Sequence, residues 1–415
     1  MTGSGRLQRR LGLGDAVVIG AGSMVGAGVF AVWSPAAQAA GDGLLVALAL
    51  AGLVAFCNAT SSAQLAALHP ESGGTYVYGR RQLGPAWGHL AGWGFVVGKT
   101  ASCAAMALTV GAYLWPEQER LVAIGAVAAI VVVNLAGVSR TAAVTRVLLA
   151  VALVALVAVV VAGWAGDPDV GRIDPLDTDA GGVLRAAGFL FFAFAGYARI
   201  ATLGEEVREP ERTIPRAIPL ALGGVLVLYA VVAFTALAAV PADALAATDA
   251  PLRVVAVAAG ADGAATIVRV GAGIAALGVL LNLVPGVSRT VLAMARRREL
   301  PVPLAVVDED RSVPLRAELS VAGVVMVLIA VVDLRDAIAL SGVAVLTYYA
   351  ITNLSALTLT DAQRRWPRPI AVAGLVGCVA LVASLPPVAV AIGAAVVASG
   401  VVARRLMPGT VDDRS

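Results

Sequence analysis

The chain has 415 residues, of which 59% are hydrophobic and only 14% are charged. This composition is too apolar for a water-soluble globular protein and is typical of a chain that crosses a membrane many times. The formal net charge of +3, from 30 basic and 27 acidic residues, excludes a nucleic-acid-binding protein, which would gather basic charge on a polar domain. The three cysteines and two histidines lack metal-ligand spacing, so we expect neither a metal site nor a disulfide framework.

Charge-poor stretches of about 20 residues, the length that crosses a hydrocarbon core about 30 Å thick, recur along the whole sequence. The polar connections between them are too poor in apolar residues to form a separate soluble domain, and the longest are expected to be loops with short helices. The pattern predicts an all-α polytopic membrane protein with twelve transmembrane helices, at 13–39, 43–67, 84–113, 120–138, 143–165, 183–205, 215–240, 265–293, 317–333, 337–359, 369–385 and 387–405.

Basic residues are concentrated in alternate loops. With the N-terminus inside, 21 arginines fall on the inner side, whereas the outer loops hold four, with two more at helix starts. Because cytoplasmic loops carry the excess of Lys and Arg, both termini are predicted to be cytoplasmic, in a multi-pass protein of the cytoplasmic (inner) membrane. The loss of one span would invert every later loop, so the charge bias supports the count of twelve.

The first span contains four glycines within nine residues, from Gly20 to Gly28. Each glycine costs about 1 kcal/mol of helix propensity relative to alanine. At membrane depth, an unwound backbone is tolerated only where it is buried in protein or lines a cavity. We therefore predict a break in this helix, with close packing of helices through small residues as the alternative.

The sixth span has a milder version of this pattern at 191–197, which reads Phe-Phe-Ala-Phe-Ala-Gly-Tyr. The two segments lie five spans apart, and an odd offset is the layout of an inverted repeat with a binding site between two discontinuous helices. We predict a first five-helix repeat within 1–165 and an inverted second repeat within 166–359. Helices 11 and 12 and the tail occupy 360–415.

Broken helices suit a zwitterionic ligand. Their ends offer free N–H groups with positive partial charge and free carbonyls with negative partial charge. An amino acid carboxylate would bind the N–H groups near Gly26, Ala27 and Gly28, and its ammonium the carbonyls near Met24, Phe192 and Ala195. The predicted substrate-binding residues are Ser23, Met24, Gly26, Ala27, Gly28, Phe192, Ala195 and Gly196.

Three segments resemble the amino acid, polyamine and organocation (APC) superfamily of permeases. They are the glycine motif at 22–30, the helix break at 191–197 and the segment at 205–216, Glu-Glu-Val-Arg-Glu-Pro-Glu-Arg-Thr-Ile-Pro-Arg. The resemblance implies a leucine-transporter-type fold, with five plus five helices and two more, and a secondary transporter of amino acids or related amines. Ala198 replaces the acidic residue of arginine/agmatine exchangers, and 149–156 lacks the helix-five lysine of some proton-coupled relatives.

Lys99 is the only lysine in the chain and lies in the middle of the third span. A lysine at a helix centre costs about 2.5 to 3.5 kcal/mol on insertion, so a functional role is expected. Lysine can lose its proton when it is buried, whereas arginine effectively cannot. We predict that Lys99 is the proton-coupling residue, with a permanently charged or snorkelling lysine as the alternative. A positive charge near the site favours neutral substrates.

Several other polar residues have two possible roles. Arg199 and Glu206 lie seven residues apart on nearly the same helical face, so a structural ion pair or an inner gate would fit Arg199, with binding of the substrate carboxylate as the alternative. Glu205 and Glu206 fit either a solvated charge cluster or a gate. Asn282 and Ser288 in span 8, like Asn353 in span 10, fit either hydrogen bonds between helices or contacts to substrate or ion. We retain Arg199, Glu205, Glu206, Asn282 and Ser288 as gating or structural candidates.

The sequence thus predicts a secondary active transporter of amino acids that works by alternating access as a proton-coupled symporter of neutral amino acids. A proton-independent exchanger and a non-transporting amino acid sensor are the alternatives. No convergent nucleophile, base or metal ligands indicate an enzyme. The expected partners are a small amino acid and the lipid bilayer, with no cofactor beyond the coupling proton. Sodium coupling and the oligomeric state stay open.

Overall fold

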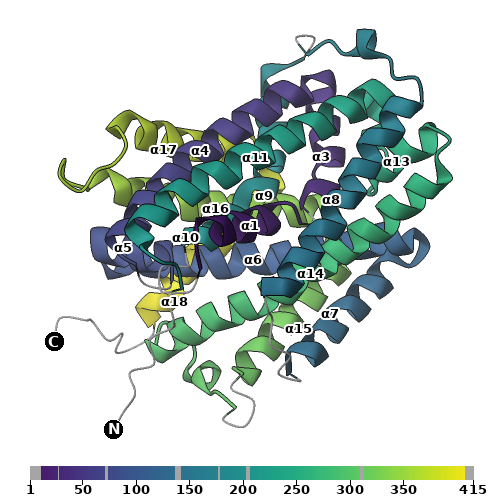
Figure 1. Cartoon of the computed structure of the whole chain (residues 1–415). Coiled ribbons are helices and arrows are strands. Elements are labelled where there is room, and N and C mark those ends of the chain that lie inside the picture. Colours follow the sequence, from purple (N-terminus) through teal and green to yellow (C-terminus); the bar gives the residue numbers. More distant parts are fainter. Residues whose placement is uncertain are drawn as a thin grey trace.

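The computed structural model describes residues 11–26, 28–70, 73–135, 142–175, 178–201, 206–308 and 313–406. Within these ranges the chain is helical apart from its loops and two isolated β-bridges. The helices pack side by side in one bundle, with α1, α9 and α10 in its middle and α17 and α7 on opposite flanks (Figure 1).

The first half of the bundle contains the first broken helix and the long helices after it. Its α-helices are α1 (Leu13–Met24), α2 (Gly28–Ala31), α3 (Trp33–Ala40), α4 (Leu44–Leu68), α5 (Thr75–Leu83), α6 (Pro85–Leu114), α7 (Glu119–Leu135) and α8 (Ala142–Ala165). Short 3-10 turns precede α4 and α7, at η1 (Gly41–Gly43) and η2 (Pro116–Gln118).

The second half begins with the second broken helix. Its elements are η3 (Val170–Arg172), α9 (Ala180–Phe194), η4 (Ala195–Tyr197), α10 (Ala198–Ala201), α11 (Pro210–Ala239), α12 (Ala242–Ala246), α13 (Pro251–Ala258), α14 (Asp262–Arg296), η5 (Val302–Ala305), α15 (Leu315–Val331), α16 (Leu334–Leu357), α17 (Arg368–Ser384) and α18 (Pro387–Leu406). As predicted, the three longest connections contain short helices.

Helices cover each span predicted from the sequence. Within the described ranges, ten segments are long and apolar enough to cross a membrane. Helices α15 and α17 have 17 residues each and are too short to be counted among these ten segments. The all-α polytopic fold is therefore confirmed, whereas the count of twelve crossings stays a prediction.

The two ends of the bundle are named here after the orientation predicted from the arginines. The inner side holds the start of α1, the end of α18 and the short helix α5. The outer side holds the end of α3, the start of α14 and the short helices α12 and α13, which lie in the α11–α14 connection.

Helix α6 packs extensively along both α14 and α16. Glycines allow this close approach: a Cβ atom on Gly98 would lie 2.7 Å from Val345 Cγ2 in α16, and one on Gly92 would lie 2.9 Å from Met294 Sδ in α14. Helices α15, α17 and α18 lie at the periphery and expose apolar side chains such as Val331, as lipid-facing helices do.

Candidate functional site

Both predicted helix breaks are present. Helix α1 ends at Met24, Val25 has a non-helical backbone (φ −77°, ψ 40°), and the next described helix, α2, begins at Gly28. The sixth span changes from α-helix to a 3-10 turn after Phe194 and then continues as the four-residue α10. The glycine-rich and aromatic-rich patterns therefore marked the positions of the breaks correctly.

The two breaks touch each other directly. A Cβ atom on Gly196 would lie 2.1 Å from the carbonyl oxygen of Ser23 and 2.7 Å from the backbone nitrogen of Met24. Only a residue without a side chain fits there, because the obstructing atoms belong to the backbone and cannot rotate away. Ser23, Met24 and Gly196, which lie about 170 residues apart in sequence, thus form one backbone contact.

The glycines of the first span also allow close contacts with three different helices. A Cβ atom on Gly20 would lie 2.2 Å from Ile200 Cδ1 in α10, and one on Gly26 would lie 2.1 Å from Val279 Cγ2 in α14. A Cβ atom on Gly28 would lie 3.0 Å from the Cα atom of Ala193 in α9. The expected alternative of close packing is therefore correct as well: the segment is both broken and tightly packed.

The free polar groups at the breaks follow from where the helices start and end. A helix that starts at Gly28 leaves the N–H groups of its first turn without an acceptor in its own helix. The carbonyl of Phe192, expected to face an ammonium, already accepts the N–H of Ala195 at the end of α9. Ala27 lies outside the described residues.

Three buried tyrosines hydrogen-bond to carbonyls beside the breaks. The Tyr229 hydroxyl of α11 donates to Met24 O at 2.7 Å and also lies 3.2 Å from Ala193 O. The Tyr349 hydroxyl of α16 donates to Ala195 O at 3.1 Å. The Tyr113 hydroxyl of α6 donates to Phe30 O at 2.8 Å and accepts the N–H of Leu252 in the first turn of α13.

These tyrosines did not enter the set predicted from the sequence. The available signal was their position inside apolar spans, because a buried tyrosine needs a partner for its hydroxyl and a broken helix offers free carbonyls. Aromatic rings line the same region: Tyr197 stacks on Tyr349 with ring centroids 5.1 Å apart, and Phe194 lies 5.2 Å from Tyr229. Aromatic side chains therefore surround the breaks.

Lys99 lies in α6 and is only partly buried within the protein. It shares a helix face with Gly92, seven residues earlier, and Gly92 packs against Met294 of α14. Helix α14 also contacts the first break through Val279. The ammonium group makes no hydrogen bond or ion pair with any residue that the structure describes.

The remaining candidates divide between the inner side and α14. Arg199 is exposed in α10, close enough to Glu206 for an electrostatic interaction, and Glu205 lies outside the described residues. The side chains of Asn282 and Ser288 hydrogen-bond to carbonyls of their own helix, Gly278 O and Val284 O. These two bonds flank Pro285, which removes a backbone donor from the middle of α14.

Asn353 follows the other expectation, a hydrogen bond between helices. Its side-chain amide donates to the Asn58 side-chain oxygen of α4 at 2.6 Å and to Tyr349 O of its own helix at 3.0 Å. Cys378 of α17 lies 3.4 Å from the same Asn58 oxygen. This buried polar cluster therefore joins three helices behind Tyr349.

At the inner side, the ends of the two broken helices are joined by a β-bridge. The N–H of Leu11, just before α1, donates to Glu206 O at 3.0 Å, and the N–H of Arg208 donates to Leu11 O at 2.9 Å. The segment after α10 is thus tied to the segment before α1. Asp15 of α1 also forms an exposed ion pair with Arg146 of α8, at 2.7 Å.

A cavity of about 350 Å³ opens at the outer side between the ends of α6, α13 and α14. Two guanidinium groups line it, those of Arg253 and Arg269, together with the carboxylate of Glu117 and the ring of Trp115. Both charge signs are present, so the cavity is suited to polar or zwitterionic solutes. Tyr113 precedes the cavity residue Leu114, and Leu252 precedes the cavity residue Arg253. The Tyr113 hydroxyl joins the N–H of Leu252 to the carbonyl of Phe30 in the first broken helix.

The site therefore consists of two interrupted helices that meet at the centre of a bundle of membrane-length helices, with backbone groups rather than reactive side chains at the meeting point. This is the architecture of a polytopic membrane transporter, in which interrupted helices bind the transported solute.

Comparison with known proteins places the chain in a family. Residues 11–408 match the sequence profile of the family described as Amino acid permease. The chain belongs to this amino acid permease family, as the resemblance of its three motifs predicted.

The relatives agree with this assignment. The chain is 58% identical over 399 residues to an uncharacterized transporter of Mycobacterium tuberculosis, covering 96% of this chain and 91% of that protein. It is 25% identical over 391 residues to the branched-chain amino acid permease BcaP of Bacillus subtilis, covering 88% and 84% of the two chains. It is also 24% identical to the mitochondrial cationic amino acid transporter 3 of Arabidopsis thaliana, covering 85% and 62%.

Proposed function

We propose that the protein is a proton-coupled symporter of neutral amino acids that binds the main-chain groups of its substrate between the two broken helices. The observation that carries this proposal is the contact of Gly196 with the backbone of Ser23 and Met24. It brings the ends of two helices together, so that N–H groups and carbonyls of opposite partial charge lie next to one another. The carboxylate and the ammonium of an amino acid match these two kinds of group.

Charge in the central helices favours a neutral substrate side chain. Between Ala16 and Gly41, and again between Ala180 and Gly204, the sequence has no Asp or Glu. Helix α6 also has no Asp or Glu, and α14 has none after Asp262, its first residue. A cationic side chain would therefore lack a counter-charge, and Lys99 adds a positive one. The relative named as a branched-chain permease agrees with this choice, and the relative named as a cationic transporter does not.

Proton coupling through Lys99 is the second part of the proposal. Lys99 shares a helix face with Gly92, which packs against Met294 of α14, and it has no ionic partner among the described residues. A lysine in such a place can exchange its proton during the transport cycle.

The test is uptake of radiolabelled amino acids into liposomes that contain the purified protein, with an inward proton gradient, a sodium gradient or no gradient. We expect proton-driven accumulation of neutral amino acids that is lost in Lys99→Gln. The matched control is Thr100→Val, which removes only a hydrogen bond to Val96 O of the same helix. This control should retain accumulation.

Two other results would overturn the proposal. Uptake that ignores the gradient but requires preloaded amino acid would identify an exchanger. Substrate binding without any flux would identify a sensor. The proposed location in the cytoplasmic membrane, with both termini inside, is tested by whether a reporter fused after Ser415 is active in the cytoplasm.

A further inference from the structure

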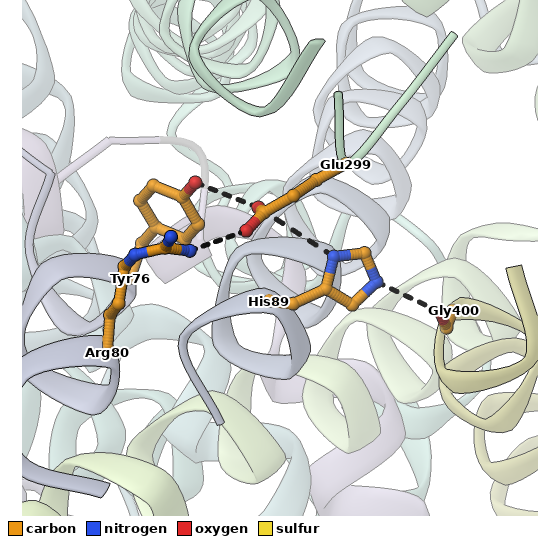
Figure 2. Close-up of polar contacts among 5 residues, drawn as sticks. All are labelled: Tyr76, Arg80, His89, Glu299 and Gly400. Carbon is orange, nitrogen blue, oxygen red and sulfur yellow. Dashed lines mark hydrogen bonds and ion pairs between the residues drawn. The ribbon is translucent and has the colours of Figure 1, made fainter. Parts of the chain in front are cut away.

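A buried carboxylate holds several elements together on the inner side of the bundle. Glu299 follows α14, and its side chain is only 1% exposed. The Tyr76 hydroxyl of α5 donates to Glu299 Oε2 at 2.8 Å, and Arg80 Nη1 donates to Glu299 Oε1 at 2.8 Å (Figure 2). Burial alone would raise the pKa of Glu299, but the approach of His89, the hydrogen bond from Tyr76 and the charge of Arg80 hold that pKa below its ordinary value. Glu299 is thus ionised.

His89 of α6 lies on the other side of this carboxylate and faces a different partner with each ring nitrogen. Its Nε2 lies 2.9 Å from Gly400 O in α18. Its Nδ1 lies 3.7 Å from Glu299 Oε2 and has no hydrogen-bond partner among the described residues (Figure 2).

The partner at Nε2 fixes the tautomer of the ring. A carbonyl oxygen can only accept a hydrogen bond, so Nε2 must carry the proton. In the neutral ring, Nδ1 then points a lone pair at an ionised carboxylate, which also only accepts. A proton on Nδ1 turns this unfavourable approach into a charge-assisted contact.

We infer that His89 is a proton-binding site on the inner side, and that its protonation clamps α18 and α6 to α5 and to the segment after α14. The inference rests on the proposed proton-coupled transport and adds a second protonatable group to Lys99. With the proton bound, His89 links Gly400 O to Glu299, which also holds Tyr76 and Arg80. Release of the proton towards the cytoplasm loosens this link, so proton release and inner opening favour each other.

Other charged groups of the elements packed around His89 set how strongly it binds the proton. Arg80 neutralises part of the Glu299 charge, and the guanidinium of Arg297 lies 5.5 Å from the centre of the Tyr76 ring. The ionisable groups on the inner ends of the elements that pack there are Tyr76, Arg80 and Arg81 of α5, Arg296 at the end of α14 with Arg297, Arg298 and Glu299 after it, Arg316 and Glu318 of α15, and Arg404 and Arg405 of α18. Among the described residues, only Glu299 makes an ion-pair contact with Nδ1.

A second link between the same helices does not depend on protons. The Trp93 indole of α6 donates to Val396 O of α18 at 2.7 Å, and Gly400 packs against the Trp93 ring. Trp93→Phe therefore removes a hydrogen bond between α6 and α18 without removing the protonatable group. It is the matched control for changes at His89.

The sequence makes a direct test practical, because His89 and His69 are its only histidines. Nitrogen-15 NMR of histidine-labelled protein in lipid nanodiscs separates the tautomers and the charged ring, and His69→Gln assigns the two signals. Spectra are recorded from about pH 8 to pH 5, and we expect the His89 signal to change over this series from the Nε2–H tautomer to the doubly protonated ring. A signal that stays in one form over this range, or that shows the Nδ1–H tautomer, overturns the inference.

Two variants sharpen the result. Glu299→Gln should weaken proton binding at His89 about tenfold or more, because a facing opposite charge is lost, whereas Trp93→Phe should leave the titration in place. In liposomes, His89→Gln should make the uptake rate independent of internal pH while gradient-driven accumulation through Lys99 persists. The NMR titration needs no transport, so its failure is distinguishable from failure of the proposed function.

Discussion

Replacing Gly196 with alanine tests whether the two breaks must touch for transport. The φ angle of Gly196 is not in the left-handed region, so an alanine can adopt the backbone conformation without strain. The whole effect must come from the added methyl group, which would lie 2.1 Å from Ser23 O and 2.4 Å from Ser23 C. These atoms belong to the backbone of the opposite break, so the two segments must separate by about 1 Å or more.

The energetic cost can be estimated from the contacts. Inserting a methyl group into a tight contact costs about 1 to 3 kcal/mol. The same separation stretches the hydrogen bonds from Tyr229 to Met24 O and from Tyr349 to Ala195 O, each worth about 1 kcal/mol. The better helix propensity of alanine returns up to about 1 kcal/mol. A net loss of about 2 kcal/mol lowers the population of the assembled site roughly thirtyfold.

The assay is initial uptake rate in liposomes together with thermal unfolding in detergent. Gly196→Ala should reduce uptake at least about tenfold at equal amounts of inserted protein. The control is Gly223→Ala in α11, where nothing lies within 4 Å of the added methyl group, so activity should be unchanged. If Gly196→Ala transported at the wild-type rate, the contact between the breaks would not be part of the transport site.

Three further outcomes are expected. Gly26→Ala should impair uptake because its methyl group would lie 2.1 Å from Val279 Cγ2, and the added change Val279→Ala should restore uptake, since this obstacle is a side chain. A disulfide between cysteines at Leu11 and Val207, the partners of the β-bridge, should leave uptake intact; a block would show that the two segments separate. Because the pKa of Glu299 is lowered, its stabilising contribution is full above its unfolded value of about 4.3 and is lost as pH falls through its folded value. The loss of thermal stability in Glu299→Gln should therefore be constant above about pH 5 and shrink as the pH falls below about 4.3, and a difference that stays constant in acid would contradict this assignment.

The sequence predicted where the chain would break but not what the breaks would contact. Glycine density and hydrophobic length are local properties, so they placed the interruption near Gly26 and the turn near Gly196 within a few residues. The partners of these glycines, such as Val279 and Ile200, come from distant helices. Their identity depends on helix rotation in the bundle, which hydropathy does not encode in an almost uniformly apolar helix.

The same reason explains why the tyrosines and the inner cluster were missed. Tyr229 and Tyr349 are ordinary apolar-span tyrosines until the bundle sets their hydroxyls against broken-helix carbonyls. His89 and Glu299 are 210 residues apart in the chain and belong to different predicted elements. Lys99 became a candidate because a lone lysine inside an apolar span is costly whichever way its helix is rotated. That argument is local and needs no partner.

The contacts at both ends of α1 indicate how the inner side can open. At the centre Gly196 contacts the backbone of Ser23 and Met24. At the inner end a β-bridge joins Leu11 to Val207. Helices α1 and α10 are therefore tied at two points and should move as one unit, because moving either alone breaks two backbone hydrogen bonds. By contrast, the ion pair between Asp15 of α1 and Arg146 of α8 is exposed and contributes little. We therefore expect an inward opening of this transporter to move the two broken helices together.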